Sequence, residues 1–194
     1  MPSIVDFVNK HQRKLTVLAA FGLVAIAAAY YFGMGVVIDE TTGKPIEGVF
    51  VVGRWRARQI TPIESSSVCF KVDSTQSDAN GRFMLWPVSW NFDPRLWSRE
   101  RQSMVYKKGY RLSETNPTGS STVLMTPDES GIDQRVASIS IAATDMVCGS
   151  RDELKRYILP VYRAMFDEVK DIAQRAGDLR YLNRLNWLIE TINR

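Results

Sequence analysis

The chain of 194 residues is 45% hydrophobic and carries a formal net charge of +4. Residues 1–14 hold three basic side chains and one acid, so they contribute +2 and the rest of the chain contributes only +2. So small an excess is too little to argue for nucleic-acid binding, and we expect no nucleic-acid partner. The hydrophobic content is sufficient for one packed domain with an appendage.

The first element in chain order is an uncharged run at residues 15–32, which reads LTVLAAFGLVAIAAAYYF. At about 1.5 Å per residue, a helix of this length just crosses a hydrocarbon core of ~30 Å. Basic residues precede the run and acidic residues follow it (Lys10, His11, Arg13, Lys14; Asp39, Glu40, Glu47). This asymmetry predicts a single transmembrane anchor at 15–33, with a basic cytoplasmic flank at 1–14 and the remaining residues across the membrane.

Two other interpretations of the same run stay open. A cleaved signal peptide would place its apolar core at residues 15–26, with alanines at cleavage spacing (Ala25, Ala27, Ala29), which would remove residues 1–29. A buried core helix would normally keep a polar stripe, which this run lacks. The apolar character continues through the aromatic residues Tyr30, Tyr31 and Phe32, which suit a membrane–water interface, so we favour a retained anchor.

Short β-branched or alternating runs separated by turn residues follow the anchor. Residues 36–38 and 49–52 are expected to form two antiparallel strands joined by a turn that contains Gly43 and Pro45. A third strand is expected at 67–73, and an Asn80–Gly81 turn leads into a fourth at 83–86. Further strands are expected at 104–106, 110–112 and 122–125. This spacing predicts a mainly β fold, a β-sandwich.

Four segments of this region read GVVIDETTGKPIEGVFVV, SDANGRFML, KKGYRL and STVLMTP. In this order they resemble the carboxypeptidase regulatory-like domain, a transthyretin-like β-sandwich found in many bacterial envelope proteins. The resemblance covers about residues 35–127 of a domain at 34–127, apart from an insertion at 91–103. It implies a non-catalytic accessory or scaffolding module, placed by the predicted anchor in the bacterial inner membrane with its C-terminal domain in the periplasm.

The last segment, residues 128–194, is expected to be an α-helical extension. Apolar residues recur at helical spacing over 154–172, where Pro160 should kink the helix or start a new one. Gly177 marks a stop, and Asp178 is expected to cap a final helix with inward leucines and isoleucine (Leu179, Leu182, Leu185, Leu188, Ile192). Residues 132–147 fit either a strand or a helix, and we favour the helix.

The chain has two cysteines, Cys69 and Cys148, far apart in the sequence. In an oxidising compartment a lone pair most simply forms a disulfide, which here would join the helical extension to the sandwich. Two buried free thiols are the alternative. We expect no metal site, because no histidine lies near either cysteine.

The only histidine of the sequence, His11, lies before the anchor. Serine–histidine or cysteine–histidine catalysis in the outer domain is therefore excluded, and so is a histidine-based zinc site. Acids are scattered in predicted turns with no paired signature, although catalysis by carboxylates alone stays open. We expect no enzymatic activity and no cofactor.

Three surfaces are candidates for binding. Arg54, Arg56 and Arg58 should share one face of a strand, as a contact for an acidic partner or lipid, or simply as a solvated face. An aromatic group suits a protein or membrane-interface contact, or else covers the end of the sandwich (Trp86, Trp90, Phe92, Trp97). The apolar faces of the C-terminal helices either pack on the sandwich or dock a partner.

These features predict a non-enzymatic, membrane-anchored accessory or scaffolding subunit of a membrane-associated protein complex. The alternative is a periplasmic binding protein or immunity-type inhibitor with one soluble partner.

Overall fold

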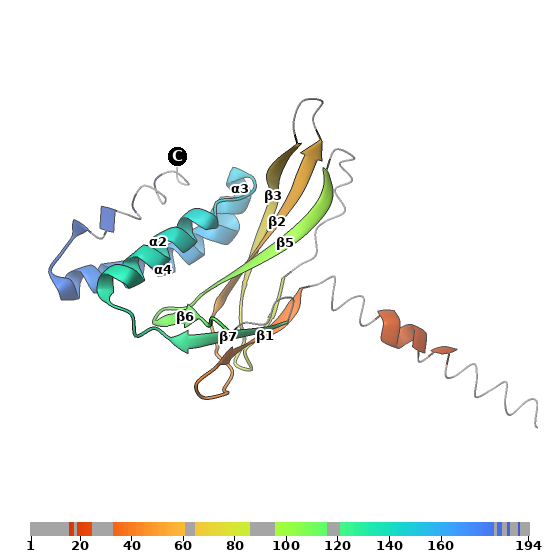
Figure 1. Ribbon diagram of the computed structural model, residues 1–194, viewed down its shortest axis with the longest axis horizontal. Coiled ribbons are helices and arrows are strands. Elements are labelled where there is room, and N and C mark those ends of the chain that lie inside the picture. The colour runs from red at the N-terminus through yellow and green to blue at the C-terminus, as the bar shows by residue number, and fades with distance from the viewer. Residues whose placement is uncertain are drawn as a thin grey trace, which may run out of the picture.

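In the computed structural model of the chain, the described residues are 16–17, 19–24, 33–60, 65–85, 96–115, 121–180, 182–183, 186 and 190. Beyond the N-terminal residues 16–24, they form strands followed by helices, coloured along the chain in Figure 1. The strands are β1 (Met34–Asp39), β2 (Phe50–Ile60), β3 (Ser65–Gln76), β4 (Arg82–Met84), β5 (Leu96–Tyr106), β6 (Tyr110–Leu112) and β7 (Thr122–Pro127). The helices are α2 (Ile132–Asp145), α3 (Arg151–Glu153), the π-helical turn η1 (Leu154–Ile158) and α4 (Leu159–Ala176).

Every predicted strand is present, and three of them are longer than expected. β2, β3 and β5 continue through polar residues, some of which are exposed, such as Arg58, Gln76 and Arg101. β5 begins at Leu96, so most of the predicted insertion at 91–103 belongs to the sheet. The turn before β4 is confirmed, with Gly81 in the left-handed region at φ 70°.

The strands form two sheets, one with the order β4-β1-β7-β6 and the other with the order β3-β2-β5. The predicted pairing of residues 36–38 with residues 49–52 is wrong, because β1 pairs with β4 and β7 and lies in a different sheet from β2. The turn after β1 does form, with a bridge between Ile38 and Pro45. The chain then leaves this sheet near Gly48, at φ 67°, and enters the other one.

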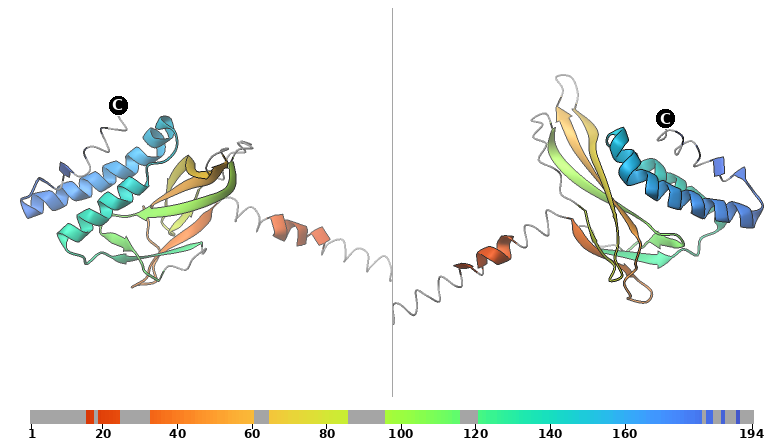
Figure 2. Two further views of the ribbon diagram at one scale, coloured as in Figure 1. Left: turned by 45° about the horizontal axis from the view of Figure 1, so that its top comes forward. Right: turned by 180° about the vertical axis from the view of Figure 1, so that it is seen from behind.

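The two sheets and the helices make three layers, as Figures 1 and 2 show. An apolar cluster between the sheets draws on both of them (Val37, Ile46, Val49, Val51, Trp55, Leu85, Met125). The opposite face of the β3-β2-β5 sheet packs against α2 and α4 through a second cluster, which includes Val52 and Val72 of the sheet and Val136, Met165 and Val169 of the helices. The C-terminal helices therefore use their apolar faces to cover the sheet.

The helical extension is confirmed, and the ambiguous residues 132–147 contain helix α2. α3, η1 and α4 run on as one helix, and Pro160 stands in the first turn of α4 directly after the π-helical turn. Because proline has no N–H to donate to the residue four positions earlier, a register change at this point is expected. The Leu159 N–H accordingly donates to the Leu154 carbonyl, five residues back.

The helix ends as predicted at Gly177, whose φ of 68° is in the left-handed region. Asp178 then accepts the backbone N–H of Arg180 over 3.0 Å, as a helix cap does. Leu182 packs on the helical cluster, but Leu179 is 67% exposed, so its predicted inward position is wrong. Leu185, Leu188 and Ile192 lie outside the described residues. With this helical layer, the described part of the chain is mixed α/β rather than mainly β.

Most of the predicted anchor at 15–33 lies outside the described residues. Residues 19–24 are helical and lie apart from the three layers in Figure 1. Within the described part of the chain, no helix has both the length and the apolar character needed to cross a membrane.

Candidate functional site

The arginines of β2 share one face of the strand, as predicted. Their register partners on β3 include Val72 and Cys69, which face the helical layer, whereas Trp55 and Ala57 between them are buried on the other side. The pairing is irregular between Trp55 and Arg56, and this irregularity brings Arg56 opposite Cys69. Side chains of β2 still alternate between the two faces of the sheet, because the extra residue at this irregularity lies on β3.

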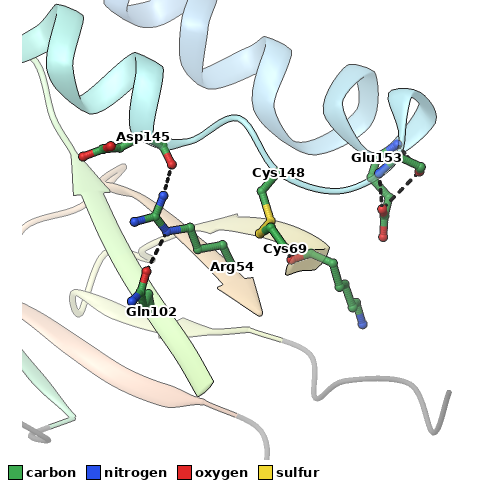
Figure 3. The surroundings of a disulfide bond; sticks show 8 residues. Arg54, Cys69, Gln102, Asp145, Cys148 and Glu153 are labelled. Atoms are coloured by element: carbon green, nitrogen blue, oxygen red, sulfur yellow. Dashed lines mark hydrogen bonds between the residues drawn. A yellow bond between two sulfur atoms is a disulfide. The ribbon is translucent and has the colours of Figure 1, made fainter. Parts of the chain in front are cut away.

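Arg54 has a structural role in this row. Its Nε donates to the Gln102 side chain over 3.0 Å, and its Nη1 donates to the backbone carbonyl of Asp145 at the end of α2. Figure 3 shows the guanidinium between these two groups, beside the disulfide. Arg54 therefore ties α2 to the sheet.

Arg56 and Arg58 lie farther along β2, nearer its end at Ile60. Arg56 is half-buried and Arg58 is exposed. Arg56 is in register with Cys69, which the disulfide joins to the helical layer, so Arg58 is the exposed member of a short basic row. Such a row fits an acidic segment or an anionic headgroup, because arginine forms paired hydrogen bonds with carboxylate and phosphate oxygens.

The aromatic group is only partly within the described structure. Trp86, Trp90 and Phe92 lie outside the described residues. The backbone of Trp97 belongs to β5, in register opposite Arg58 of β2. One residue of each of two candidate surfaces is therefore in backbone register on neighbouring strands.

The disulfide is present, with a Cα–Cα distance of 5.5 Å between Cys69 of β3 and Cys148 after α2. Gly149 follows it at φ 85°, where a Cβ would come within 2.7 Å of Glu153 Oε2. Ser150 and Glu153 then form a capping box that starts α3. A disulfide of this kind indicates an oxidising location outside the cytoplasm.

A buried ionic cluster, which the sequence did not predict, holds the helices on the sheet near its other end. Arg135 of α2 donates to both Glu168 carboxylate oxygens, over 3.0 and 2.9 Å, and to Asp128 Oδ2 over 2.9 Å. Its remaining N–H groups donate to the carbonyls of Tyr110 and Lys107. All five donors of the guanidinium are therefore used, which is what a buried arginine requires.

Two more groups complete the surroundings of Glu168, whose side chain lies in the centre of the cluster. The Tyr106 hydroxyl donates to Oε2 over 2.7 Å, and the Gly109 N–H donates to Oε1 over 3.2 Å. Burial and the negative charge of Glu168 raise the pKa of the Tyr106 hydroxyl. Burial alone would lower the pKa of Arg135, but the hydrogen bonds and charge of Glu168 outweigh it and raise that pKa.

The sequence does contain a signal for this cluster. Glu168 interrupts the apolar stripe of α4, between Met165 and Val169, and Arg135 stands directly before Val136 in α2. Charged residues at core positions of two neighbouring helices indicate a buried pair. The cluster has the geometry of a structural crosslink, because its polar atoms are directed at one another.

Across the described residues, no group of three or more histidine, cysteine, aspartate or glutamate side chains is placed to hold a metal ion. His11 lies outside them. No protein-family model, curated protein sequence or solved structure matched the chain.

Proposed function

We propose that this chain is a non-enzymatic, membrane-anchored envelope protein that serves as an accessory or scaffolding subunit of a membrane-associated protein complex. The observation that carries the proposal is the N-terminal helix. Residues 19–24 are uncharged and exposed, with Phe21 at 71%, Leu23 at 70% and Val24 at 66% exposure. A helix without a polar face, exposed in this way, requires lipid or protein around it.

The compartment we propose is the periplasmic side of a bacterial inner membrane, and the disulfide supports it by favouring an oxidising location outside the cytoplasm. The basic flank at 1–14 supports a cytoplasmic N-terminus, because basic residues remain on the cytoplasmic side of a span.

The accessory role is supported by the resemblance of residues 35–127 to carboxypeptidase regulatory-like domains and by the basic row on β2. The resemblance implies a module that binds without catalysis. The exposed Arg58 is in backbone register with Trp97 of β5, and arginine and tryptophan are residue types that are common at protein interfaces.

The test is purification of the tagged full-length protein in mild detergent, followed by native mass analysis and identification of the copurifying proteins. A stoichiometric set of membrane proteins supports the proposal. A protein that is extracted alone, intact and monomeric overturns it and favours the periplasmic inhibitor or binding protein with a soluble partner.

A pair of matched variants tests the surface. We expect Arg56→Ser with Arg58→Ser to reduce copurification at least tenfold. Arg163→Ser with Lys170→Ser, which changes two exposed basic residues of α4, should leave it unchanged. Equal loss in both variants would show that net charge, and not this surface, determines assembly.

A further inference from the structure

The start of β1 and the end of β4 meet where the N-terminal segment enters the domain. Met34 stands opposite Met84 in the antiparallel register. The Leu85 N–H donates to the Gly33 carbonyl over 3.3 Å, which fixes the end of β4 beside this entry point. The outward-facing residues of these two strands form what we call the anchor-proximal patch (Met34, Val36, Arg82, Met84).

The side chains of the patch combine exposed apolar and basic character. Met34 is 51% exposed and Met84 is 40% exposed, on neighbouring strands. Arg82 is also exposed and shares the outward face of β4 with Met84, because Phe83 between them packs between the sheets. A second basic residue, Arg101, lies against Gly33, where a Cβ would be 3.0 Å from its Cζ.

The opposite end of β1 carries acidic residues. Asp39 ends the strand, about 17 Å from Met34 at ~3.3 Å per residue, and Glu40 follows it. Hydrogen bonds from Thr41, Thr42 and Tyr110 overcome the effect of burial and lower the pKa of Asp39, so it is ionised at neutral pH. Arg111 and Lys44 also lie at this end, so the exposed methionines Met34 and Met84 are what distinguish the anchor end of the sheet.

Chain geometry connects the patch to the membrane. Two Cα steps of 3.8 Å separate Phe32 from Met34, so their Cα atoms are at most about 7.6 Å apart. A span that ends at Phe32 therefore leaves Met34 and its partner Met84 at the level of the headgroups. Methionine there contacts the acyl boundary, and arginine contacts lipid phosphates while its stem stays in the apolar region.

We infer that the anchor-proximal patch rests on the headgroup layer of a bilayer that contains anionic phospholipid, with the Asp39 end of the four-stranded sheet directed away. This inference rests on the membrane anchor proposed above. It deepens that proposal by identifying the lipid-facing end of the domain and the class of lipid it contacts.

The test uses the full chain in nanodiscs of phosphatidylcholine, with or without phosphatidylglycerol. A nitroxide label is attached at Met84→Cys or, as the matched control, at Lys44→Cys in the exposed turn beyond β1. Collision rates with oxygen and with a water-soluble nickel chelate report lipid and water contact. Intact mass verifies that the native disulfide is retained in both variants.

We expect the label at residue 84 to collide severalfold more with oxygen than with nickel in anionic nanodiscs, and the label at residue 44 to show the reverse. Arg82→Gln with Arg101→Gln should remove the difference in collision rates at residue 84 between nanodiscs with and without phosphatidylglycerol. A chain that is incorporated but has both labels equally open to nickel overturns this inference alone. A chain that is not incorporated overturns the anchor, and this inference with it.

Discussion

The β3-β2-β5 sheet is covered on both faces, and the two covers are held in different ways. Towards the other sheet, the buried residues are apolar side chains such as Val51, Leu85 and Met125. Towards the helices, a similar apolar cluster is supplemented by the disulfide, the Arg54 link and the Arg135–Glu168 cluster. One interface relies on packing, and the other adds covalent and ionic crosslinks.

Chain connectivity explains the difference. The chain passes from one sheet to the other at the connections β1–β2, β3–β4, β4–β5 and β5–β6, so the two sheets are joined several times. The helical layer follows all strands and is attached through one connection, after β7. A layer with one backbone connection gains more from crosslinks, because they limit how far the helices can separate from the sheets in the unfolded and partly unfolded states.

Of the changes that test this comparison, removal of the disulfide should lower the free energy of unfolding most. Cys69→Ala with Cys148→Ala releases a crosslink with a sequence separation of 79. In the chain-entropy model, the free energy of unfolding should fall by about 4 kcal/mol. Urea unfolding monitored by circular dichroism measures it, and wild-type protein in reductant should show the same loss. A change below about 1 kcal/mol would mean that the crosslink does not hold the helical layer.

Loss of a buried charge should cause the second-largest loss of unfolding free energy. Glu168→Gln leaves Arg135 buried beside an uncharged amide, and we expect a loss of about 3 kcal/mol in unfolding free energy, as for other broken buried pairs. The control is Asp171→Asn, one turn later on α4, which breaks an exposed pair with Lys108 and should cost less than ~1 kcal/mol. Similar losses in both variants would refute a special role for the buried cluster.

The sheet–sheet interface provides the contrasting substitution. Met125→Ala removes a side chain that is 1% exposed, and truncations of this kind cost about 2 to 3 kcal/mol at sites that partly collapse. Because no charge is involved, the loss should be the same at pH 7 and pH 4. A loss that changed with pH would show that the sheet–sheet interface also depends on ionised groups.

The positions of the strands were predictable, because short β-branched runs lie between turn residues such as Asn80–Gly81. Their lengths were not, because the sequence patterns of β2, β3 and β5 do not show how far the pairing of neighbouring strands extends. The strands that pair with β1 could not be predicted from a local sequence pattern either. The turn at Gly43 is compatible with a hairpin, and the choice of β4 and β7 depends on burial across the whole sandwich.

The candidate site was predictable to a similar degree. A lone cysteine pair is sufficient to predict the disulfide, and the alternation of β2 is sufficient to place three arginines on one face. The structural role of Arg54 depends on where α2 ends, which no spacing in β2 reveals. The Arg135–Glu168 pair joins residues that are 33 positions apart, and although each charge interrupts an apolar stripe, the stripe alone does not show which residue is its partner.

The smallest expected effect concerns the pH dependence of the helical interface. Burial would raise the pKa of Asp128, but hydrogen bonds from Ser130 and the charge of Arg135 outweigh it and lower that pKa. A lowered pKa in the folded state adds stability that is complete above the unfolded value of about 3.9 and is lost as the pH falls through the folded value.

Asp128→Asn should therefore cost about 1 kcal/mol at pH 6, the value of a charge-assisted hydrogen bond, and less at pH 3. The exposed neighbour Glu129→Gln is the matched control and should show no difference at either pH. Urea unfolding at the two pH values measures both variants. Wild type and Asp128→Asn share all other carboxylates. The change with pH in the difference between their unfolding free energies therefore reports on Asp128. If that difference stayed constant between pH 6 and pH 3, the Asp128 carboxylate would contribute through its shape and not its charge. The ionic crosslink between the helices and the sheet would then consist of Arg135 and Glu168.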